Sequence, residues 1–408
     1  MKDDINTPVA PTAGIDWATD TNETCIVDSD GQVLHRSNTT MDAAGIREII
    51  GDLERFSVAR VAIERPDGPV VDALLAADIE VVVITPRQIK NLRSRYGSAG
   101  NKDDRFDAFV LADTLRTDPG LLRPLQPDSA QTMVLRQAVR ARGDLVETRV
   151  ALCNQLRAHL KLVFPGAVGL FATLDSPISL AFLTRFPTTE KAAWLSHKRL
   201  GAWLSARRYS GRTTTATLLE RLQNAPAGLT SDAGATAGRT TLVLVATIES
   251  ICAQIRVLEA DIAEQFAVHP DSHIFASLPR SGKIRAAKLL AEIGDARGRY
   301  PTAEALAALA GACPSTRASG RLHVVSFRWA CDKKLRDAVT DFAGDSRRAS
   351  PWAAAIYDRH RTDGKTHQHT VRILARAWIR VIWRCWQDGT PYDPSLHGGA
   401  QARLTTAA

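Results

Sequence analysis

Residues 13–17, Ala13-Gly14-Ile15-Asp16-Trp17, decide the fold of the N-terminal region. This short run is rich in strand-forming residues and carries an acidic side chain near its end. Two further runs, 23–27 and 32–36, are joined by the turn Asp28-Ser29-Asp30-Gly31, which is typical of a hairpin. The sequence therefore predicts three consecutive strands at the start of a sheet.

Helical and strand patterns alternate after these three strands. Apolar periodicity predicts helices over 41–56 and 69–77 and strands over 60–64 and 79–85. Strands that are separated by helices usually pair in parallel, whereas hairpin strands pair antiparallel. The N-terminal region is therefore expected to fold as a mixed α/β sheet.

Four carboxylates occupy positions that such a sheet can bring together. Asp16 lies in the first strand, and Glu64 ends the fourth. Asp104 and Asp107 are three residues apart near the start of a helix, hence on one face. Carboxylates about 4 Å apart repel by about 4 kcal/mol at an effective dielectric of about 20, so the cluster needs cations or protons. A pair of Mg²⁺ ions prefers oxygen ligands and stabilises both oxygens exchanged at a phosphodiester.

The alternative is structural. Asp16 and Glu64 can be ordinary polar residues at strand ends, while Asp104 and Asp107 stabilise a helix N-terminus. Spacing alone leaves both interpretations open.

The order and spacing of these acids resemble the DEDD-type transposases of the insertion-sequence 110 family. The matching stretches are Gly14-Ile15-Asp16, Ile63-Glu64-x-x-x-Gly68, Ile84-Thr85-Pro86 and Lys102-x-Asp104-x-x-Asp107-Ala108. The resemblance implies an α/β RNase H-like, RuvC-like N-terminal domain whose catalytic, Mg²⁺-binding residues are Asp16, Glu64, Asp104 and Asp107. The turn after Glu64 departs from the family pattern, and Asp103 falls outside it.

Charge is distributed unevenly along the chain. The net charge of +8 combines −10 in residues 1–80 with +18 in residues 81–408. A basic region of this size favours a polyanionic partner such as nucleic acid over a merely solvated surface. Six cysteines lie far apart, no secretory signal begins the chain, and no run of about 18 apolar residues is found. These features predict a cytoplasmic bacterial protein, nucleoid-associated when it acts, with no membrane insertion.

Helical patterns dominate beyond residue 126. Long helices are expected over about 132–163 and 241–266, paired as a hairpin or as a dimerisation coiled coil. Residues 165–240 between them lack a clear pattern and are expected to form an irregular insert. The predicted domains are 1–125, a helical 126–270, a mainly α-helical 271–392 with a helix-hairpin-helix-like turn at Leu278-Pro279-Arg280-Ser281-Gly282, and a tail at 393–408.

A second motif lies in the C-terminal region. A small-residue helix is followed by Gly311-x-x-Pro314 and, after four intervening residues, by Ser319-Gly320. This arrangement resembles the C-terminal signature of the same family, which implies that Ser319 is the catalytic nucleophile. A serine hydroxyl needs activation by a base or metal. The resemblance implies that the acidic site of one subunit and the serine of another assemble on DNA. The rival serines are Ser281, Ser315 and Ser326.

Basic side chains supply candidate contacts to nucleic acid. One group precedes the acidic helix, and a stripe with four-residue spacing lies along the last long helix. A solvated face is the alternative for both groups. The candidate nucleic-acid-binding residues are Arg87, Lys90, Arg93, Arg95, Arg321, Lys333, Lys334, Arg372, Arg376 and Arg380.

These features together predict the transposase of an insertion element, which exchanges DNA strands through a serine–DNA covalent intermediate with help from Mg²⁺. The resemblance further implies donor and target DNA, a guiding bridge RNA, and a homo-oligomer, dimer or tetramer, as partners. One alternative is a metal-dependent RuvC-like junction nuclease without a covalent serine, against which Ser319 argues. The other is a non-catalytic, architectural DNA-binding protein, against which the four acids argue.

Overall fold

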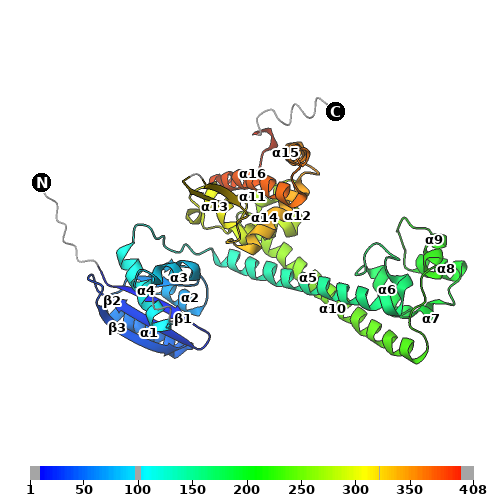
Figure 1. Ribbon diagram of the computed structural model, residues 1–408, viewed down its shortest axis with the longest axis horizontal. Coiled ribbons are helices and arrows are strands. Elements are labelled where there is room, and N and C mark those ends of the chain that lie inside the picture. The colour runs from blue at the N-terminus through cyan, green and yellow to red at the C-terminus, as the bar shows by residue number, and fades with distance from the viewer. Residues whose placement is uncertain (1–9, 97–102, 321, 397–408) are drawn as a thin grey trace. The chain divides into compact units, whose positions relative to one another are not determined.

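The computed structural model describes residues 10–96, 103–320 and 322–396. The chain divides into two compact units, Met1–Pro127 and Asp128–Ala408, which are described separately (Figure 1). The finer division predicted for the second unit, with boundaries at 270 and 392, stays a prediction.

A five-stranded mixed sheet in the order β3-β2-β1-β4-β5 forms the centre of the first unit. The strands are β1 (Thr12–Trp17), β2 (Thr21–Val27), β3 (Val33–Thr40), β4 (Arg60–Ile63) and β5 (Glu80–Val83). The first three pair antiparallel, whereas β4 lies parallel to both β1 and β5. The predicted mixed α/β sheet is confirmed, and the first and fourth strands are neighbours.

Helices cover both faces of this sheet. α1 (Ala43–Arg55) and α2 (Pro69–Ala76) pack on one face, and α3 (Pro86–Arg93) and α4 (Asp104–Thr117) pack on the other. Side chains alternate between the faces along each strand, so that Ile15 faces α1 and α2. Gly14 and Asp16 consequently lie on the face of β1 that α4 covers.

Gly14 allows α4 to lie directly on β1. A Cβ atom at position 14 would be 2.1 Å from the Ala108 carbonyl oxygen and 2.5 Å from the Ala112 amide nitrogen. Any larger residue would therefore push the helix away from the strand. The Thr12 hydroxyl fixes the same contact by donating to the Ala112 carbonyl over 2.9 Å. The close packing brings the acidic start of α4 to the end of β1.

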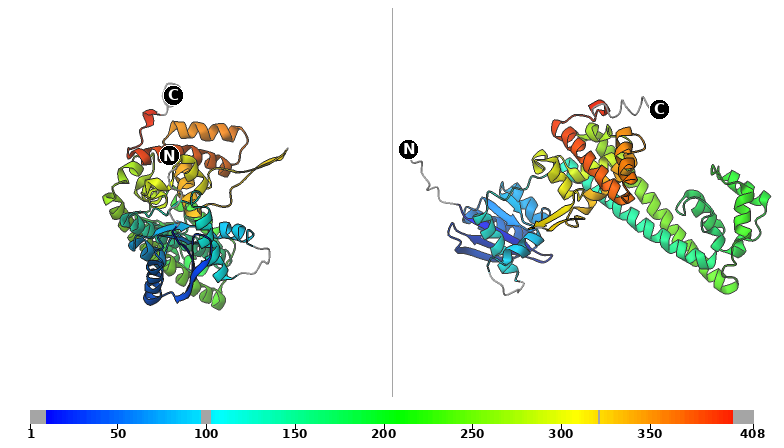
Figure 2. Two further views of the ribbon diagram at one scale, coloured as in Figure 1. Left: turned by 90° about the vertical axis from the view of Figure 1, so that its left-hand side faces the viewer. Right: turned by 45° about the horizontal axis from the view of Figure 1, so that its top comes forward.

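The second unit contains a long antiparallel pair of helices, α5 (Ala130–Val163) and α10 (Ser231–Val268), visible in Figures 1 and 2. The start of α5 and the end of α10 share one apolar core, while the end of α5 and the middle of α10 share another. An ion pair of 2.7 Å between Arg142 and Glu259 links the two helices. The expected helical hairpin is confirmed.

α10 begins earlier than the sequence analysis expected, at Ser231. From sequence alone, Gly234 and Gly238 suggest a mobile connection. In the structure, both glycines lie in α10 and allow close packing. A Cβ atom would lie 2.5 Å from the Leu229 carbonyl oxygen at Gly234, and 2.7 Å from the Thr188 methyl carbon at Gly238.

The prediction of an irregular insert over 165–240 is wrong. After the short η1 (Pro165–Ala167), the segment forms α6 (Pro177–Arg185), α7 (Thr189–Ala192), α8 (His197–Ala206) and α9 (Thr215–Gln223). Each α-helix starts at a serine or threonine whose side chain accepts from a backbone amide. Such short helices span too few turns to give a clear apolar period, which is why the sequence pattern did not reveal them.

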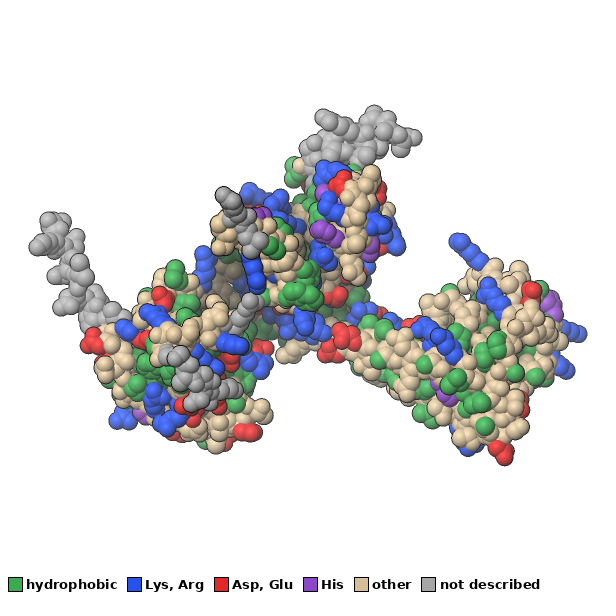
Figure 3. Space-filling model, viewed as in Figure 1, with side chains coloured by type: hydrophobic (Ala, Val, Ile, Leu, Met, Phe, Trp, Pro, Cys, Tyr) green, Lys and Arg blue, Asp and Glu red, His purple; other side chains and the backbone are tan. Residues whose placement is uncertain are grey.

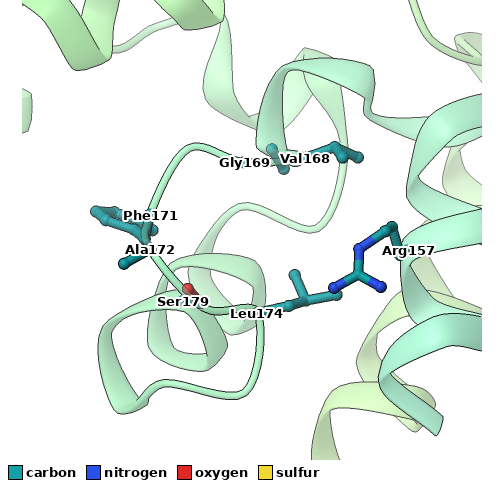
Figure 4. A pocket seen from close by; sticks show the side chains of 8 residues that line it. Arg157, Val168, Gly169, Phe171, Ala172, Leu174 and Ser179 are labelled. Atoms are coloured by element: carbon teal, nitrogen blue, oxygen red, sulfur yellow. The ribbon is translucent and has the colours of Figure 1, made fainter. Parts of the chain in front are cut away.

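A cavity of about 140 Å³ lies in this insert (Figure 4). Its lining is mostly apolar, and Arg157 is the only titratable residue among the residues that line it. The Ser179 hydroxyl donates to the Thr173 carbonyl over 2.6 Å. The cavity therefore offers no acid, base or nucleophile pair for catalysis.

The C-terminal part of the second unit is mainly helical, as predicted. Its core surrounds Trp378 and Trp386. The helices are α11 (Ser272–Ala276), α12 (Gly282–Ile293), η2 (Arg297–Arg299), α13 (Ala303–Leu309), α14 (Lys333–Ser346), α15 (Pro351–Thr362), α16 (His367–Asp388) and η3 (Pro394–Leu396). The turn between α11 and α12 has positive φ at Arg280 and Gly282, and its role in binding DNA stays a prediction.

One hairpin interrupts these helices and was not expected. β6 (Ser315–Ser319) and β7 (Leu322–Ser326) pair antiparallel as a separate two-stranded sheet. In the left view of Figure 2 this yellow hairpin projects from the helical body. The strands pair only with one another and β6 is almost wholly exposed, so the hairpin lacks the apolar run of a buried strand.

Within the described residues, α10 is the one helix that is long and apolar enough to cross a membrane by length and composition. A helix over about 241–266 is predicted from the sequence, but threonine and serine residues interrupt its apolar run, so no continuous run of about 18 apolar residues is found there. The core helix of a soluble protein passes the same test, and α10 packs along α5, so this observation is weak evidence for a membrane span.

Candidate active site

Three of the four predicted acids converge at the junction of β1 and α4. Ligand oxygens of Asp16, Asp104 and Asp107, called here the acidic cluster, all lie within 4.8 Å of one another. Asp104 and Asp107 share a face because they are three residues apart in the first turn of α4. Asp107 is buried, Asp16 is half-buried and Asp104 is exposed. The cluster is thus anchored in the core but open to solvent on one side.

Glu64 is placed beside this cluster by the backbone. It directly follows β4, and the register Ile15 opposite Ile63 makes it the neighbour of Asp16. Its carboxylate is not part of the acidic cluster among the described residues. The following loop folds onto Trp17, because a Cβ atom at Gly68, where φ is +112°, would be 3.0 Å from that ring. This loop is the place where the sequence departs from the family pattern.

Asp103 has a structural role next to these acids. It is the N-cap of α4, and its side chain accepts a hydrogen bond of 3.1 Å from the Arg105 amide. A carboxylate at this position satisfies an orphan donor and interacts favourably with the helix dipole. The structure thereby explains why this acid lies outside the motif.

Arg93 of α3 forms an ion pair with the buried member of the acidic cluster. Its Nε and Nη2 atoms donate to the two carboxylate oxygens of Asp107. A buried carboxylate needs a compensating positive charge, and here the guanidinium supplies it. An all-oxygen donor set that already attracts a cation is consistent with a divalent metal. Arg93, a candidate nucleic-acid contact by its sequence position, is thus engaged by a carboxylate of the chain itself.

Tyr96 supports this arrangement from the turn that follows α3. Its hydroxyl donates to Asp113 of α4 over 2.7 Å. Burial and the adjacent carboxylate raise the pKa of Tyr96 to about 12, so the hydroxyl stays protonated and remains a donor at neutral pH. The contact holds α3, and with it Arg93, against α4.

Replacing Arg93 by glutamine is expected to tighten Mn²⁺ binding at the acidic cluster by about tenfold, because a competing charged hydrogen-bond partner worth about 1.5–3 kcal/mol is removed. Electron paramagnetic resonance of free Mn²⁺ measures this affinity without DNA. Arg95→Gln is the matched control, since Arg95 pairs with Asp118 over 3.1 Å instead. Unchanged or weaker Mn²⁺ binding by Arg93→Gln would show that the guanidinium does not compete with the metal.

Ser319 lies at the end of β6, where the hairpin turns through Gly320. The serine is exposed, and Gly320 has φ of +54°, which suits a tight two-residue turn. The part of the chain that the structure describes contains no hydrogen-bond partner for the Ser319 hydroxyl. The hairpin therefore presents the hydroxyl to solvent, and no described side chain is hydrogen-bonded to it as an activating base.

Gly311 of the same motif has a specific packing role. Its φ is +60°, and a Cβ atom there would lie 2.4 Å from Nη2 of Arg336. The Arg336 side chain thus crosses the glycine and reaches the base of the hairpin, where it donates to the Arg328 carbonyl. This contact is a physical reason for glycine in Gly311-x-x-Pro314.

The rival serines lie away from the hairpin turn. Ser281 is 3% exposed and donates to the Leu278 carbonyl over 3.0 Å. Ser315 and Ser326 face one another at the opposite end of the hairpin, where the Ser326 hydroxyl lies 3.4 Å from the Ser315 carbonyl. Ser319 is the serine that the hairpin turn exposes.

The candidate basic residues divide into paired and unpaired groups. Among those described, Arg93, Arg95, Lys334 and Arg380 form ion pairs with carboxylates of the chain itself. For Lys90, Lys333, Arg372 and Arg376, no acidic partner is found among the described residues. Arg321 and the side chain of Arg87 lie outside what the structure describes. Figure 3 shows Lys and Arg side chains on the visible face of the second unit.

The mixed sheet thus carries an acidic cluster where β1 meets α4, and the family models that match the chain give the class of protein, a transposase. Residues 13–165 match a family model described as a transposase, and residues 272–358 match a model described as the transposase IS116/IS110/IS902 family. The chain belongs to this IS110 family of transposases.

Individual relatives agree with this assignment. The putative transposase of the IS117 mini-circle of Streptomyces coelicolor is 34% identical over 400 residues, covering 93% of this chain and 94% of the relative. An uncharacterised 42 kDa protein of insertion element IS900 from Mycobacterium paratuberculosis is 27% identical and covers 94% and 97%. Apart from these relatives, a solved structure titled "T. thermophilus RuvC in complex with Holliday junction substrate" matches 29% of this chain and all of its own, with 18% identity and a TM-score of only 0.24.

Proposed function

We propose that the acidic cluster and Ser319 act in one reaction, in which the transposase breaks and rejoins DNA strands through a phosphoserine intermediate. The observation that carries this proposal is the exposed Ser319 hydroxyl, to which no described side chain is hydrogen-bonded as a base. The other motif of the chain is an acidic cluster that holds no nucleophile. Each motif lacks what the other provides. RuvC-like hydrolysis without a covalent serine is the second candidate, and the acidic cluster alone supports it.

The proposed chemistry is a pair of transesterifications. The Ser319 Oγ forms a bond to phosphorus, the bond from phosphorus to the leaving strand oxygen breaks, and that oxygen takes up a proton. The hydroxyl proton of Ser319 passes to a carboxylate of the acidic cluster and from there to the leaving strand oxygen. Attack by a strand hydroxyl on the phosphoserine reverses these changes, so no external energy source is needed for rejoining.

The chain's acids fit a bound Mg²⁺. Asp16, Asp104 and Asp107 would hold it, with Glu64 adjacent on β4. When bound, a divalent cation supplies Lewis-acid stabilisation of the negative charge that develops on phosphate oxygens. Asp107 keeps its orientation because it is buried and fixed by the first turn of α4.

Guidance by a bridge RNA and assembly of two or four subunits are further parts of the proposal. The excess of positive charge in residues 81–408 supports a nucleic-acid partner, and the family resemblance suggests that one partner is RNA. Sequencing the DNA beside the gene for a structured non-coding RNA would identify the candidate guide. The proposed location is the cytoplasm, at the nucleoid.

Mixing two inactive variants tests assembly between subunits. Asp107→Asn disables the acidic site, and Ser319→Ala lacks the nucleophile. Mixed oligomers should therefore regain a measurable part of the strand exchange of the wild type. Omission of the guide RNA should remove the exchanged DNA product. Each variant alone is the control. A mixture as inactive as either variant would show that both groups must belong to one subunit.

A further inference from the structure

An aromatic pair follows the hairpin that carries Ser319. Phe327 and Trp329 come directly after β7, with ring centroids 4.8 Å apart and ring planes at 82°. Trp329 is 81% exposed, which is unusual for the largest apolar side chain. One ring is thus partly buried at the base of the hairpin, while the other presents its surface to solvent.

Two arginines from separate helices meet on the Phe327 ring. The guanidinium carbon of Arg336 in α14 is 4.6 Å from the ring centroid, and that of Arg372 in α16 is 4.8 Å from it. Burial and the neighbouring Arg336 charge lower the pKa of Arg372. Two like charges on one ring repel one another, and an anion between them would relieve this repulsion.

Neither arginine is neutralised within the described part of the chain. No carboxylate lies within ion-pair distance of Arg336 or Arg372, and the Nε atom of Arg336 is buried without a hydrogen-bond partner. A buried guanidinium donor without an acceptor is costly. A negatively charged acceptor from another molecule would supply the missing partner and balance both charges.

Along α16, only some of the arginines lack a carboxylate partner in the part of the chain that the structure describes. Arg380 pairs with Glu304 over 3.3 Å, and Arg384 pairs with Asp388 over 2.6 Å. Arg372 and Arg376, at the other end of the same stripe, have no such partner among the described residues. The unpaired charge is thus concentrated beside Phe327.

We propose that Phe327, Trp329, Arg336 and Arg372 form a binding site for one DNA strand, called here the strand clamp. A phosphate would lie between the two guanidinium groups, which can each donate to it with charge-assisted hydrogen bonds. An unstacked base would stack on the exposed face of Trp329, because every base offers a π surface to an aromatic side chain.

The hairpin relates the strand clamp to the proposed nucleophile. Ser319 is four residues along β6 from Ser315, which pairs with Ser326 next to Phe327. At about 3.3–3.4 Å per residue the two ends are about 13–14 Å apart. At about 3.4 Å per nucleotide along a duplex strand, the clamp would hold DNA about four nucleotides from the attacked phosphodiester. That the bound strand is the one attacked by Ser319 rests on the proposed function. That the strand clamp binds a DNA strand does not.

Binding measurements with a non-reacting protein test the clamp. Fluorescence anisotropy of a labelled single-stranded DNA oligonucleotide and its duplex would use Ser319→Ala as the background, so that no strand is cut. Arg372→Gln should weaken binding about five- to tenfold and lower the slope of log K against log salt by about one. Trp329→Ala should weaken single-strand binding about tenfold and duplex binding less.

A matched control comes from the same helix. Arg384→Gln removes an equal charge from α16, but that arginine is already paired with Asp388, so binding should stay within about twofold of the background. A central 2-aminopurine in the single strand should lose its quenching when Trp329 is replaced by alanine. Arg336 is left unchanged because it also packs across Gly311.

The outcomes separate this inference from the proposed function. Equal binding by Arg372→Gln, Trp329→Ala and Arg384→Gln would overturn the strand clamp, even if Ser319 forms adducts. If Arg372→Gln and Trp329→Ala weaken the binding of an RNA strand of the same sequence but leave DNA binding at the level of the background, the occupant of the strand clamp is not DNA. A clamp that binds as expected in a protein that never forms a serine adduct would leave the clamp intact and refute the phosphoserine mechanism.

Discussion

Replacing Ser319 by alanine should abolish both strand exchange and covalent protein–DNA adducts, lowering the rate by at least about a thousandfold, because the variant lacks the atom that would form the bond to phosphorus. DNA binding should stay within about twofold, since an exposed hydroxyl without a partner contributes little to folding or to phosphate contacts. Labelled nicked DNA, incubated with protein and guide RNA and resolved by denaturing electrophoresis, measures the adduct directly.

Ser326→Ala is the control for this variant. Ser326 lies on the neighbouring strand of the same hairpin, so its replacement makes the same chemical change at the end remote from the turn. It should keep wild-type adduct formation. If adducts survive in Ser319→Ala, the nucleophile is another residue, and Ser315 is the first to test.

Replacing Asp107 by asparagine should lower strand cleavage by at least about a thousandfold while DNA binding is retained, because the change removes the buried negative charge that orients a divalent cation. The variant keeps the size of the side chain, but it leaves Arg93 without its anionic partner. Cleavage of labelled DNA, with and without excess EDTA, measures the effect. EDTA should abolish wild-type cleavage as well.

Asp103→Asn is the matched control for Asp107→Asn. Asp103 caps α4, and asparagine is as good an N-cap as aspartate, so this variant should fold and cleave DNA like the wild type. Full activity of Asp107→Asn, or cleavage in excess EDTA, would show that the acidic cluster does not act through a metal.

The N-terminal part of the site could be predicted because the sequence patterns that indicate it each span only a few residues. Short apolar runs predicted the strands, and a spacing of three residues put Asp104 and Asp107 on one helix face. Gly14 is the sequence signal for the close packing of α4 on β1. A glycine within a strand often marks a point where another backbone approaches closely. The neighbouring position of Glu64 depended on a strand order that the sequence left open and that the structure supplies.

The remaining features depend on tertiary contacts that have no local signature. Arg93 precedes a helix rich in acids, and nothing in its sequence context distinguishes a contact to phosphate from its ion pair with Asp107. The position of the Glu64 carboxylate depends on a loop that folds over Trp17. The hairpin of Ser319 consists of short strands that pair only with one another, so its residues lack the pattern of a buried sheet.

The sequence likewise does not show which arginines of α16 have ion-pair partners. Four-residue spacing placed Arg372, Arg376 and Arg380 on one face, but it did not tell which of them already have a partner. Glu304, which pairs with Arg380, lies far away in the sequence. Only the folded chain separates the neutralised end of the stripe from the end beside Phe327.

Peptide mass spectrometry of the trapped wild-type adduct tests the central claim most directly. Nuclease digestion of the protein–DNA species, followed by proteolysis, should yield one peptide that carries a nucleotide phosphate on Ser319. Fragmentation distinguishes this serine from Ser315 and Ser326 in the same hairpin. A wild-type protein that cuts DNA efficiently but carries no nucleotide on Ser319 would contradict the phosphoserine mechanism and favour hydrolysis by the acidic cluster alone.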